Sequence, residues 1–190
     1  AINLHIFDHV GIDTYIAKPS VMSSRASPNY SGLFNDSVTA IMTNAKITAS
    51  DDWFDYVKHR KIYNFEGVSV GLLYITPSLQ QYSMGAVETL RPAVRALRRS
   101  VDVVVVIYQD REVIGHDALE TLAAYGAEDK SLPDVLIDVG SKTSPTTIVN
   151  GNFNGTHLWN GTVQIDGYGI YLTFTVSKIT NQVVSADVRR

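Results

Sequence analysis

The chain has 190 residues, of which 45% are hydrophobic and 18% charged, and its formal net charge is −3. This length and composition are typical of one globular domain, residues 1–190, and no apolar run approaches the roughly 20 residues of a membrane-spanning helix. The slightly acidic balance gives no reason to expect nucleic acid as a partner, and the lack of cysteine excludes disulfides, thiolate zinc sites and cysteine nucleophiles.

The first part of the chain alternates strand and loop patterns. Residues 2–7 are a short apolar run that ends at Asp8, which predicts a strand delivering polar side chains into a loop. Residues 18–37 are rich in Ser and Asn and contain two prolines, so they are predicted to be a loop. Residues 38–43 then favour another strand.

A short helix and a hairpin are predicted next. Ser50 is a suitable N-cap for a helix that runs through Val57 and ends in the basic run 58–61. Residues 62–65 and 68–75 are apolar and β-branched, and the Glu-Gly pair between them suits a tight turn. These two segments therefore indicate a β-hairpin.

A further helix is predicted around Pro92. Proline is tolerated in the first helical turn, so the helix is expected to start there and to run to about residue 99, with Val94 and Leu97 facing the core. Four arginines share this segment, and a solvated helix face is the simplest interpretation of them. They are Arg91, Arg95, Arg98 and Arg99.

Two buried strands come next. The continuous β-branched run at residues 101–107 is typical of a strand buried on both faces. A helix at 117–125 leads to a second such strand at 134–139, and the order strand, helix, strand implies parallel pairing. Beyond Gly140 the pattern changes to an antiparallel meander separated by Asn- and Gly-rich turns. Its strands are predicted at residues 163–165, 168–177 and 182–188.

These patterns together predict the α/β fold class, as a sandwich of two packed mixed sheets with flanking helices. Six segments, in their order along the chain, also match the boxes of a known family. They are Asn3-Leu4-His5-Ile6-Phe7-Asp8, residues 40–44, residues 63–71, residues 102–111, residues 134–143 and Gly167-Tyr168-Gly169-Ile170-Tyr171-Leu172. On these segments the chain resembles the 5'-nucleotidase type of the calcineurin-like metallophosphoesterases. The resemblance implies the later part of such a domain, so we expect the sandwich to be incomplete at its N-terminal side.

The resemblance also implies a site in which two metal ions clamp a phosphate and activate a water. His5 falls on a histidine that the family directs at the phosphate or leaving group, but the preceding asparagine ligand is Leu4 here. A leucine side chain has no lone pair for a cation, so this metal contact cannot form. His5 is therefore interpreted as a vestigial catalytic residue.

The remaining matched ligand positions are also replaced. A histidine ligand falls on Gln109, and the two histidines of the family's Gly-His-Ser-His box fall on Gly140 and Lys142. A protonated Lys142 places a positive charge where a dication would lie, although it could hold a phosphate or carboxylate directly. We therefore predict Gln109, Ser141 and Lys142 as binding residues and no metal ligand.

A second alignment remains open. It places Leu4 to Gly11 on the family's first strand, which would make Asp8 a metal ligand. Each alignment implies its own function. The first alignment implies a catalytically degenerate domain without a cofactor, which acts as a structural or binding module in a larger assembly. The second alignment implies a metal-dependent phosphohydrolase or nucleotidase with two divalent ions, such as Mn²⁺ or Zn²⁺, whose remaining ligands lie on an upstream segment or chain.

Because the family's first strand and helix are not matched, a sheet edge and an apolar face are expected to need a cover. We predict that a protein partner or companion segment covers the N-terminal side. No signal-peptide pattern is found at Ala1, so a processed or truncated product is expected.

Glycosylation sequons suggest a secreted or cell-surface protein. The four acceptor positions are Asn29, Asn35, Asn154 and Asn160. A secreted glycoprotein that binds ligands through its Asn-rich loops is therefore a third possible function. Near two of the sequons, His157 and Trp159 are predicted to lie among turn residues, with the indole anchoring a loop.

Overall fold

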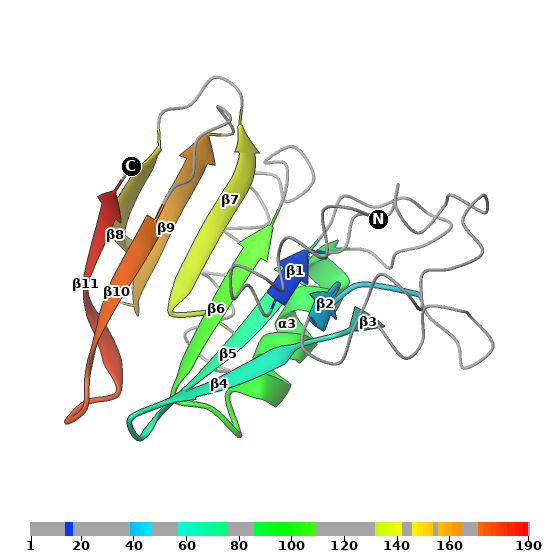
Figure 1. Ribbon diagram of the computed structural model, residues 1–190, viewed down its shortest axis with the longest axis horizontal. Coiled ribbons are helices and arrows are strands. Elements are labelled where there is room, and N and C mark those ends of the chain that lie inside the picture. The colour runs from blue at the N-terminus through cyan, green and yellow to red at the C-terminus, as the bar shows by residue number, and fades with distance from the viewer. Residues whose placement is uncertain are drawn as a thin grey trace, which may run out of the picture.

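The computed structural model shows three β-sheets and a helix in the part of the chain that it describes (Figure 1). The described residues are 14–16, 39–46, 57–75, 86–108, 132–141, 146–153, 156–164 and 171–189. The predicted strand at 2–7, the loop at 18–37 and the helix at 117–125 lie outside these ranges. No helix among the described residues is long and apolar enough to cross a lipid bilayer.

The largest sheet has six strands in the order β4-β5-β6-β7-β9-β8. Their bounds are β4 (Lys61–Phe65), β5 (Val68–Ile75), β6 (Val103–Tyr108), β7 (Val135–Ser141), β8 (Thr147–Phe153) and β9 (Thr156–Gln164). The four central strands are parallel, whereas β4 and β8 pair antiparallel at the two edges. The predicted α/β class with mixed sheets and the parallel pairing of the two buried strands are therefore confirmed.

The predicted hairpin is formed by β4 and β5. Its turn residues Glu66 and Gly67 have φ angles of 47° and 92°. A two-residue turn matches the right-handed twist of the flanking strands when both of its residues have positive φ angles. Glycine adopts the second of these angles at no steric cost. The Glu-Gly pair thus fixes the register of this edge of the sheet.

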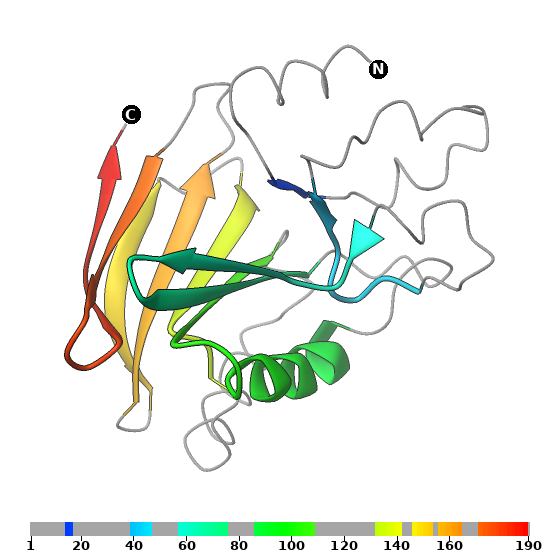
Figure 2. The same ribbon diagram turned by 60° about the horizontal axis from the view of Figure 1, so that its bottom comes forward.

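Helix α3 (Ala86–Leu97) packs on one face of the six-stranded sheet, alongside β4 and β5 (Figure 2). Leu90, Val94 and Leu97 are fully buried, and their spacing of four and three residues places them on one side of the helix. The core on this face combines these three with alternate residues of the strands. The strand residues are Leu73, Ile75, Val104, Val106, Tyr108, Leu136 and Leu158.

The predicted start of this helix at Pro92 was wrong. The helix begins six residues earlier, at Ala86, so Pro92 lies in its interior. Proline lacks the N–H that would bond to the carbonyl one turn back, which costs the helix stability. Burial of Leu90 before the proline and of Val94 and Leu97 after it compensates for that loss.

Arg98 does not belong to a solvated arginine face. Its guanidinium donates to an Asp134 carboxylate oxygen and, at 2.7 Å, to the Leu132 carbonyl. The same Asp134 oxygen accepts the Val104 N–H at 2.7 Å. Arg98 therefore ties the end of α3 to the starts of β6 and β7, while Arg95 and Arg99 are exposed as predicted.

The second sheet is the antiparallel hairpin of β10 (Tyr171–Ser177) and β11 (Gln182–Arg189), which lies across the face opposite α3 (Figure 1). Leu172, Phe174 and Val176 of β10 are partly buried, whereas the residues between them are exposed. This period of two turns the apolar side of the hairpin towards the large sheet. The predicted single meander was wrong, because the preceding hairpin β8–β9 belongs to the large sheet.

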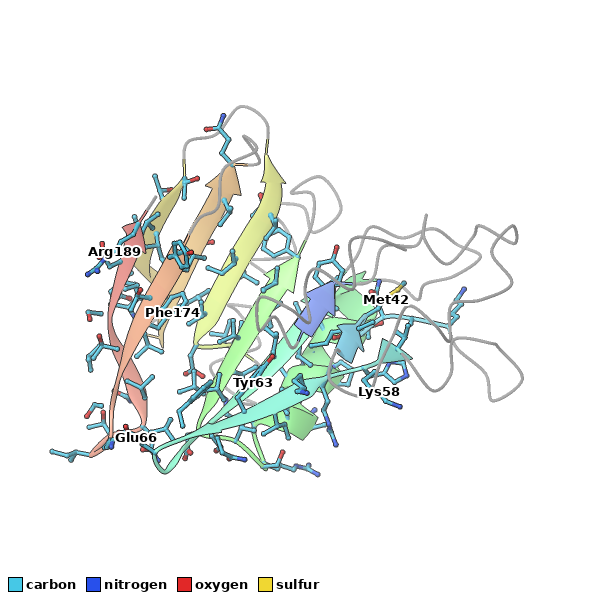
Figure 3. All side chains as sticks on the ribbon, in the orientation of Figure 1. Met42, Lys58, Tyr63, Glu66, Phe174 and Arg189 are labelled. Atoms are coloured by element: carbon cyan, nitrogen blue, oxygen red, sulfur yellow. The ribbon has the colours of Figure 1, made fainter. Side chains whose placement is uncertain are left out.

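Three side-chain contacts fasten this hairpin to the large sheet. The Trp159 indole donates to the Val183 carbonyl at 3.0 Å. The Lys178 Nζ atom lies 2.8 Å from Glu66 Oε2 at the tip of the β4–β5 hairpin, where Figure 3 labels Glu66. The predicted turn at His157 and Trp159 was wrong, since both residues lie in β9, and the Trp159 indole anchors the β10–β11 hairpin instead of a loop of its own. The third contact involves Asp102.

Asp102 is a junction between the two sheets. Its carboxylate accepts hydrogen bonds from the Ser69 hydroxyl at 2.6 Å and the Ser69 N–H at 2.8 Å, and from the Asn181 amide at 2.7 Å. These bonds favour the ionised form, and those from Ser69 contribute most to lowering the pKa of the Asp102 carboxyl below its ordinary value.

A carboxyl whose pKa is lowered by folding stabilises the fold above its unfolded pKa and loses this effect as pH falls through its folded pKa. We therefore expect Asp102→Asn to destabilise the protein at neutral pH. The gap in urea midpoint between the wild type and this variant should shrink as the pH falls from about 5 towards about 2. Glu66→Gln, which removes the carboxylate of the exposed Glu66–Lys178 ion pair, is the control for loss of a solvated surface charge. A gap between the wild type and Asp102→Asn that stays constant with pH would contradict this role of Asp102.

The third sheet is small and parallel. It contains β1 (Thr14–Ile16), β2 (Thr39–Ile41) and β3 (Val57–Lys58), in that order. The strand predicted at 38–43 is confirmed by β2, whereas β1 was not predicted. The predicted helix was wrong at Val57, since that residue pairs with Ala40 as a strand and is buried beside it.

Candidate functional site

The carboxyl ends of β6 and β7 meet at one edge of the large sheet. The two strands are parallel neighbours, and Tyr108 pairs with Asp138 near their ends. β6 ends at Tyr108, directly beside Asp138, and β7 continues for three more residues to Ser141. Ser141 ends β7, and only its backbone is described, while Gln109 and Lys142 lie outside the described residues.

A buried carboxylate lies at the same strand ends. Asp138 is 2% exposed and shares its register position with Tyr108 on one side and Thr162 on the other. Alternation along β7 puts it on the face of Leu136, which is the face that α3 covers. Asp138 lies within a segment that matches the family, but it was not predicted as a site residue. Among the described residues, no three His, Cys, Asp or Glu side chains gather as a metal site would require.

Most of the other predicted site residues, His5, Asp8, Asn29, Asn35 and Asn154, lie outside the described residues. Asn160 lies in β9, where it pairs with Leu136 and Val149 and is partly buried. Its glycosylation remains a prediction.

A concave feature lies where β2 and β3 end. It is a hollow of about 1020 Å³ between the segments after these strands and one side of α3. Four basic residues line it, and the described lining residues include no acidic one. They are Lys46, Lys58, His59 and Arg60. Figure 3 shows Lys58 at this end of the molecule, far from Arg189 of β11.

A hydrogen-bond network fixes the wall of this hollow. The Thr43 hydroxyl donates to the His59 carbonyl at 2.7 Å and accepts the Tyr74 N–H at 2.9 Å. The Thr43 N–H donates to the Tyr74 carbonyl at 2.8 Å, and the Met42 N–H donates to the Lys58 carbonyl at 3.0 Å. His59 Nδ1 lies 3.0 Å from the Thr43 carbonyl, which can only accept, so Nδ1 carries the proton and Nε2 is left for other contacts.

This hollow was not predicted from the sequence, where the basic run at 58–61 was interpreted as the end of a helix. The available signal was the concentration of positive charge in Lys58, His59 and Arg60 within a chain whose net charge is −3. Lys46 and α3 join the hollow only through tertiary structure.

An apolar gap separates the two packed sheets. Its volume is about 650 Å³, and the ion pair of Glu66 with Lys178 lies at one end. Val103 and Val105 line it from the large sheet, and Phe174 lines it from the hairpin. Three large apolar side chains of this hairpin are exposed, Tyr171 at 72%, Val184 at 55% and Ile179, in the turn, at 95%.

Comparison with known proteins gives structural relatives only. No protein-family model matches the chain, and no curated protein matches it. A protein from Staphylococcus aureus described as a 5'-nucleotidase, solved in complex with alpha-ketoglutarate, is similar with a TM-score of 0.59 and 16% identity over 97% of this chain. The NAD nucleotidase NadN of Haemophilus influenzae gives a TM-score of 0.53 with 12% identity, and a 5'-nucleotidase precursor from Thermus thermophilus gives 0.52 with 16% identity, each over 80% of this chain.

These likenesses show a 5'-nucleotidase-like fold. The chain spans 39% of the Staphylococcus aureus protein and 33% of each of the other two. The fold predicted from the six ordered sequence segments is thus supported by solved structures.

Proposed function

We propose that this chain is a catalytically degenerate metallophosphoesterase-like domain that acts as a structural or binding module within a larger assembly. The observation that carries this proposal is the residue content of one edge of the sheet. β6 ends at Tyr108, directly before the segment that begins at Gln109, and Tyr108 pairs with Asp138 of β7, two residues before the segment that begins at Gly140. In the family that the chain resembles, both segments supply histidines to a metal pair.

The residues at these positions are poor ligands for divalent cations. Gln109 offers an amide oxygen, which binds first-row metals more weakly than imidazole does, and Gly140 offers no side chain. A Lys142 ammonium about 4 Å from a dication would oppose binding by roughly 2 kcal/mol even at the dielectric constant of water. The same ammonium suits a phosphate or carboxylate, so Gln109, Ser141 and Lys142 are proposed to bind an anion without a metal cofactor.

The assembly is proposed from the hairpin and the length of the structural relatives. Tyr171 and Val184 expose large apolar surfaces on a two-stranded sheet, and such a sheet gains stability from further strands or cover. The solved relatives are more than twice as long as this chain. We therefore propose a companion protein segment as the cover, with secretion or cell-surface exposure suggested by the sequons.

A phosphatase assay tests the lack of catalysis. The purified chain, alone and within its full-length gene product, should not hydrolyse p-nitrophenyl phosphate or AMP in the presence of Mn²⁺. The control is the same assay with EDTA. Hydrolysis that EDTA abolishes would overturn the proposal in favour of a metal-dependent phosphohydrolase that uses ligands such as Asp8 or an upstream segment.

A further inference from the structure

The basic hollow beside α3 is separate from the edge where β6 and β7 end. None of its described lining residues comes from either strand. Its volume of about 1020 Å³ is close to the upper end for small-molecule sites, which commonly measure about 300–1,000 Å³. Ligand binding in this hollow is therefore independent of whether the chain catalyses phosphate hydrolysis at the β6–β7 edge.

The charge in the hollow is one-sided. Lys58 and Arg60 contribute positive charges to its lining, which also includes Lys46 and His59. Within the part of the chain that is described, no ion pair joins Lys58 or Arg60 to a carboxylate. Like charges held close together repel each other, so a multiply charged anion between them would relieve that repulsion. The two positive charges of Lys58 and Arg60 suit the dianion of a phosphate better than the single charge of a carboxylate.

The wall that carries these charges is preorganised. Lys58 and His59 are held through their backbone carbonyls by Met42 and Thr43, and Thr43 is bonded in turn to Tyr74 of β5. A ligand therefore need not order this segment when it binds, which reduces the entropic cost of association. His59 adds a polar ring to the same wall.

The opposite wall is mostly apolar, with Thr89 of α3 as its polar residue among those described. Leu73 lines the hollow from β5, and Pro92, Ala93 and Ala96 line it from α3. These side chains cannot bond to an oxyanion, but they can pack against a ring or a short hydrocarbon. A basic wall that faces an apolar one matches a ligand with a charged group and an apolar body.

We propose that this hollow binds a small phosphate monoester, with the phosphate against Lys58 and Arg60 and the organic body against Ala93 and Ala96. The probe is phenyl phosphate, measured by isothermal titration calorimetry with the full chain at low salt. Inorganic phosphate and benzoate are the comparison ligands. Phenyl phosphate should bind more tightly than either, because it alone combines the dianion with an apolar ring.

Three variants locate the binding. Lys58→Ala and Arg60→Ala should each weaken phenyl phosphate binding roughly tenfold, as expected for loss of a charge-assisted contact. Ala96→Trp keeps every charge but fills the hollow from the exposed side of α3, and it should weaken phenyl phosphate more than inorganic phosphate. As the matched control, Arg99→Ala removes an exposed charge outside the hollow and should change the affinity less than about twofold. Circular dichroism confirms that each variant is folded.

Equal weakening by Arg99→Ala and Lys58→Ala would show that the anion responds only to overall charge and would overturn the proposal. Undiminished phenyl phosphate binding in folded Ala96→Trp would place the ligand elsewhere and would also overturn it. If benzoate binds as tightly as phenyl phosphate, the site takes carboxylates and the phosphate assignment is wrong. If Gln109→Ala or Lys142→Ala abolishes phenyl phosphate binding and Lys58→Ala leaves it unchanged, the ligand binds at the β6–β7 edge and the proposal is wrong.

Discussion

Replacing Gly71 with alanine should destabilise the fold by about 2 kcal/mol, since overpacking of a core typically costs about 1–3 kcal/mol. A Cβ atom at Gly71 would lie 2.5 Å from Leu97 Cδ2, 2.7 Å from Cγ and 2.9 Å from Cδ1. Leu97 is fully buried between α3 and the sheet, so its side chain cannot move aside without disturbing its neighbours. Gly71 therefore sets how closely the helix approaches β5.

A double-mutant cycle gives this contact a specific test. Leu97→Ala alone should cost about 3 kcal/mol through lost burial and the cavity that it leaves. In the double variant the new methyl group occupies part of that cavity, so the combined cost should be smaller than the sum by about 1–2 kcal/mol. Urea denaturation measures all three variants.

Gly67→Ala is the matched control for this cycle. It is strained by the φ angle of 92°, but a Cβ atom there would have no neighbour within 4 Å. Its cost of about 1 kcal/mol should therefore add to that of Leu97→Ala without coupling. Additivity of Gly71→Ala with Leu97→Ala would show that the helix does not pack on the sheet as described.

The elements that could be predicted from the sequence are those with local signals. The turn at Glu66 and Gly67 and the β-branched run of β6 are specified by neighbouring residues. The position of Pro92 in the helix could not be predicted, because its cost is offset by burial against distant strands. The same limit applies to β9, where local residues predicted only a short strand at 163–165 and not the sheet that it joins.

The candidate sites also divide into one that the sequence could predict and others that depend on tertiary packing. Parallel strands 101–107 and 134–139 imply that the segments after them meet, so the β6–β7 edge could be predicted from chain order alone. The basic hollow could not, because Lys46, Lys58 and α3 come together only through the pairing of β2 with β3 and the packing of α3. Asp138 resembled any polar residue in a strand until its burial was known.

The second large effect concerns cation binding at the β6–β7 edge. The triple variant Gln109→His, Gly140→His, Lys142→His should bind Mn²⁺ more tightly than the natural sequence, because it supplies three imidazoles and removes one positive charge. As a control, Arg99→His adds an imidazole and removes a charge on the exposed surface of the segment after α3. It should leave Mn²⁺ binding unchanged. Equal gains in both variants would mean that the three positions do not converge.

The most direct measurement of the central claim is a titration of the natural sequence with Mn²⁺, monitored by calorimetry and by elemental analysis after dialysis. Under the proposed function it should show no saturable uptake of a metal pair and no metal retained, because Gln109, Gly140 and Lys142 are poor cation ligands. Saturable binding of two ions per chain that is lost in Gln109→Ala would contradict the account and restore the metal-dependent phosphohydrolase.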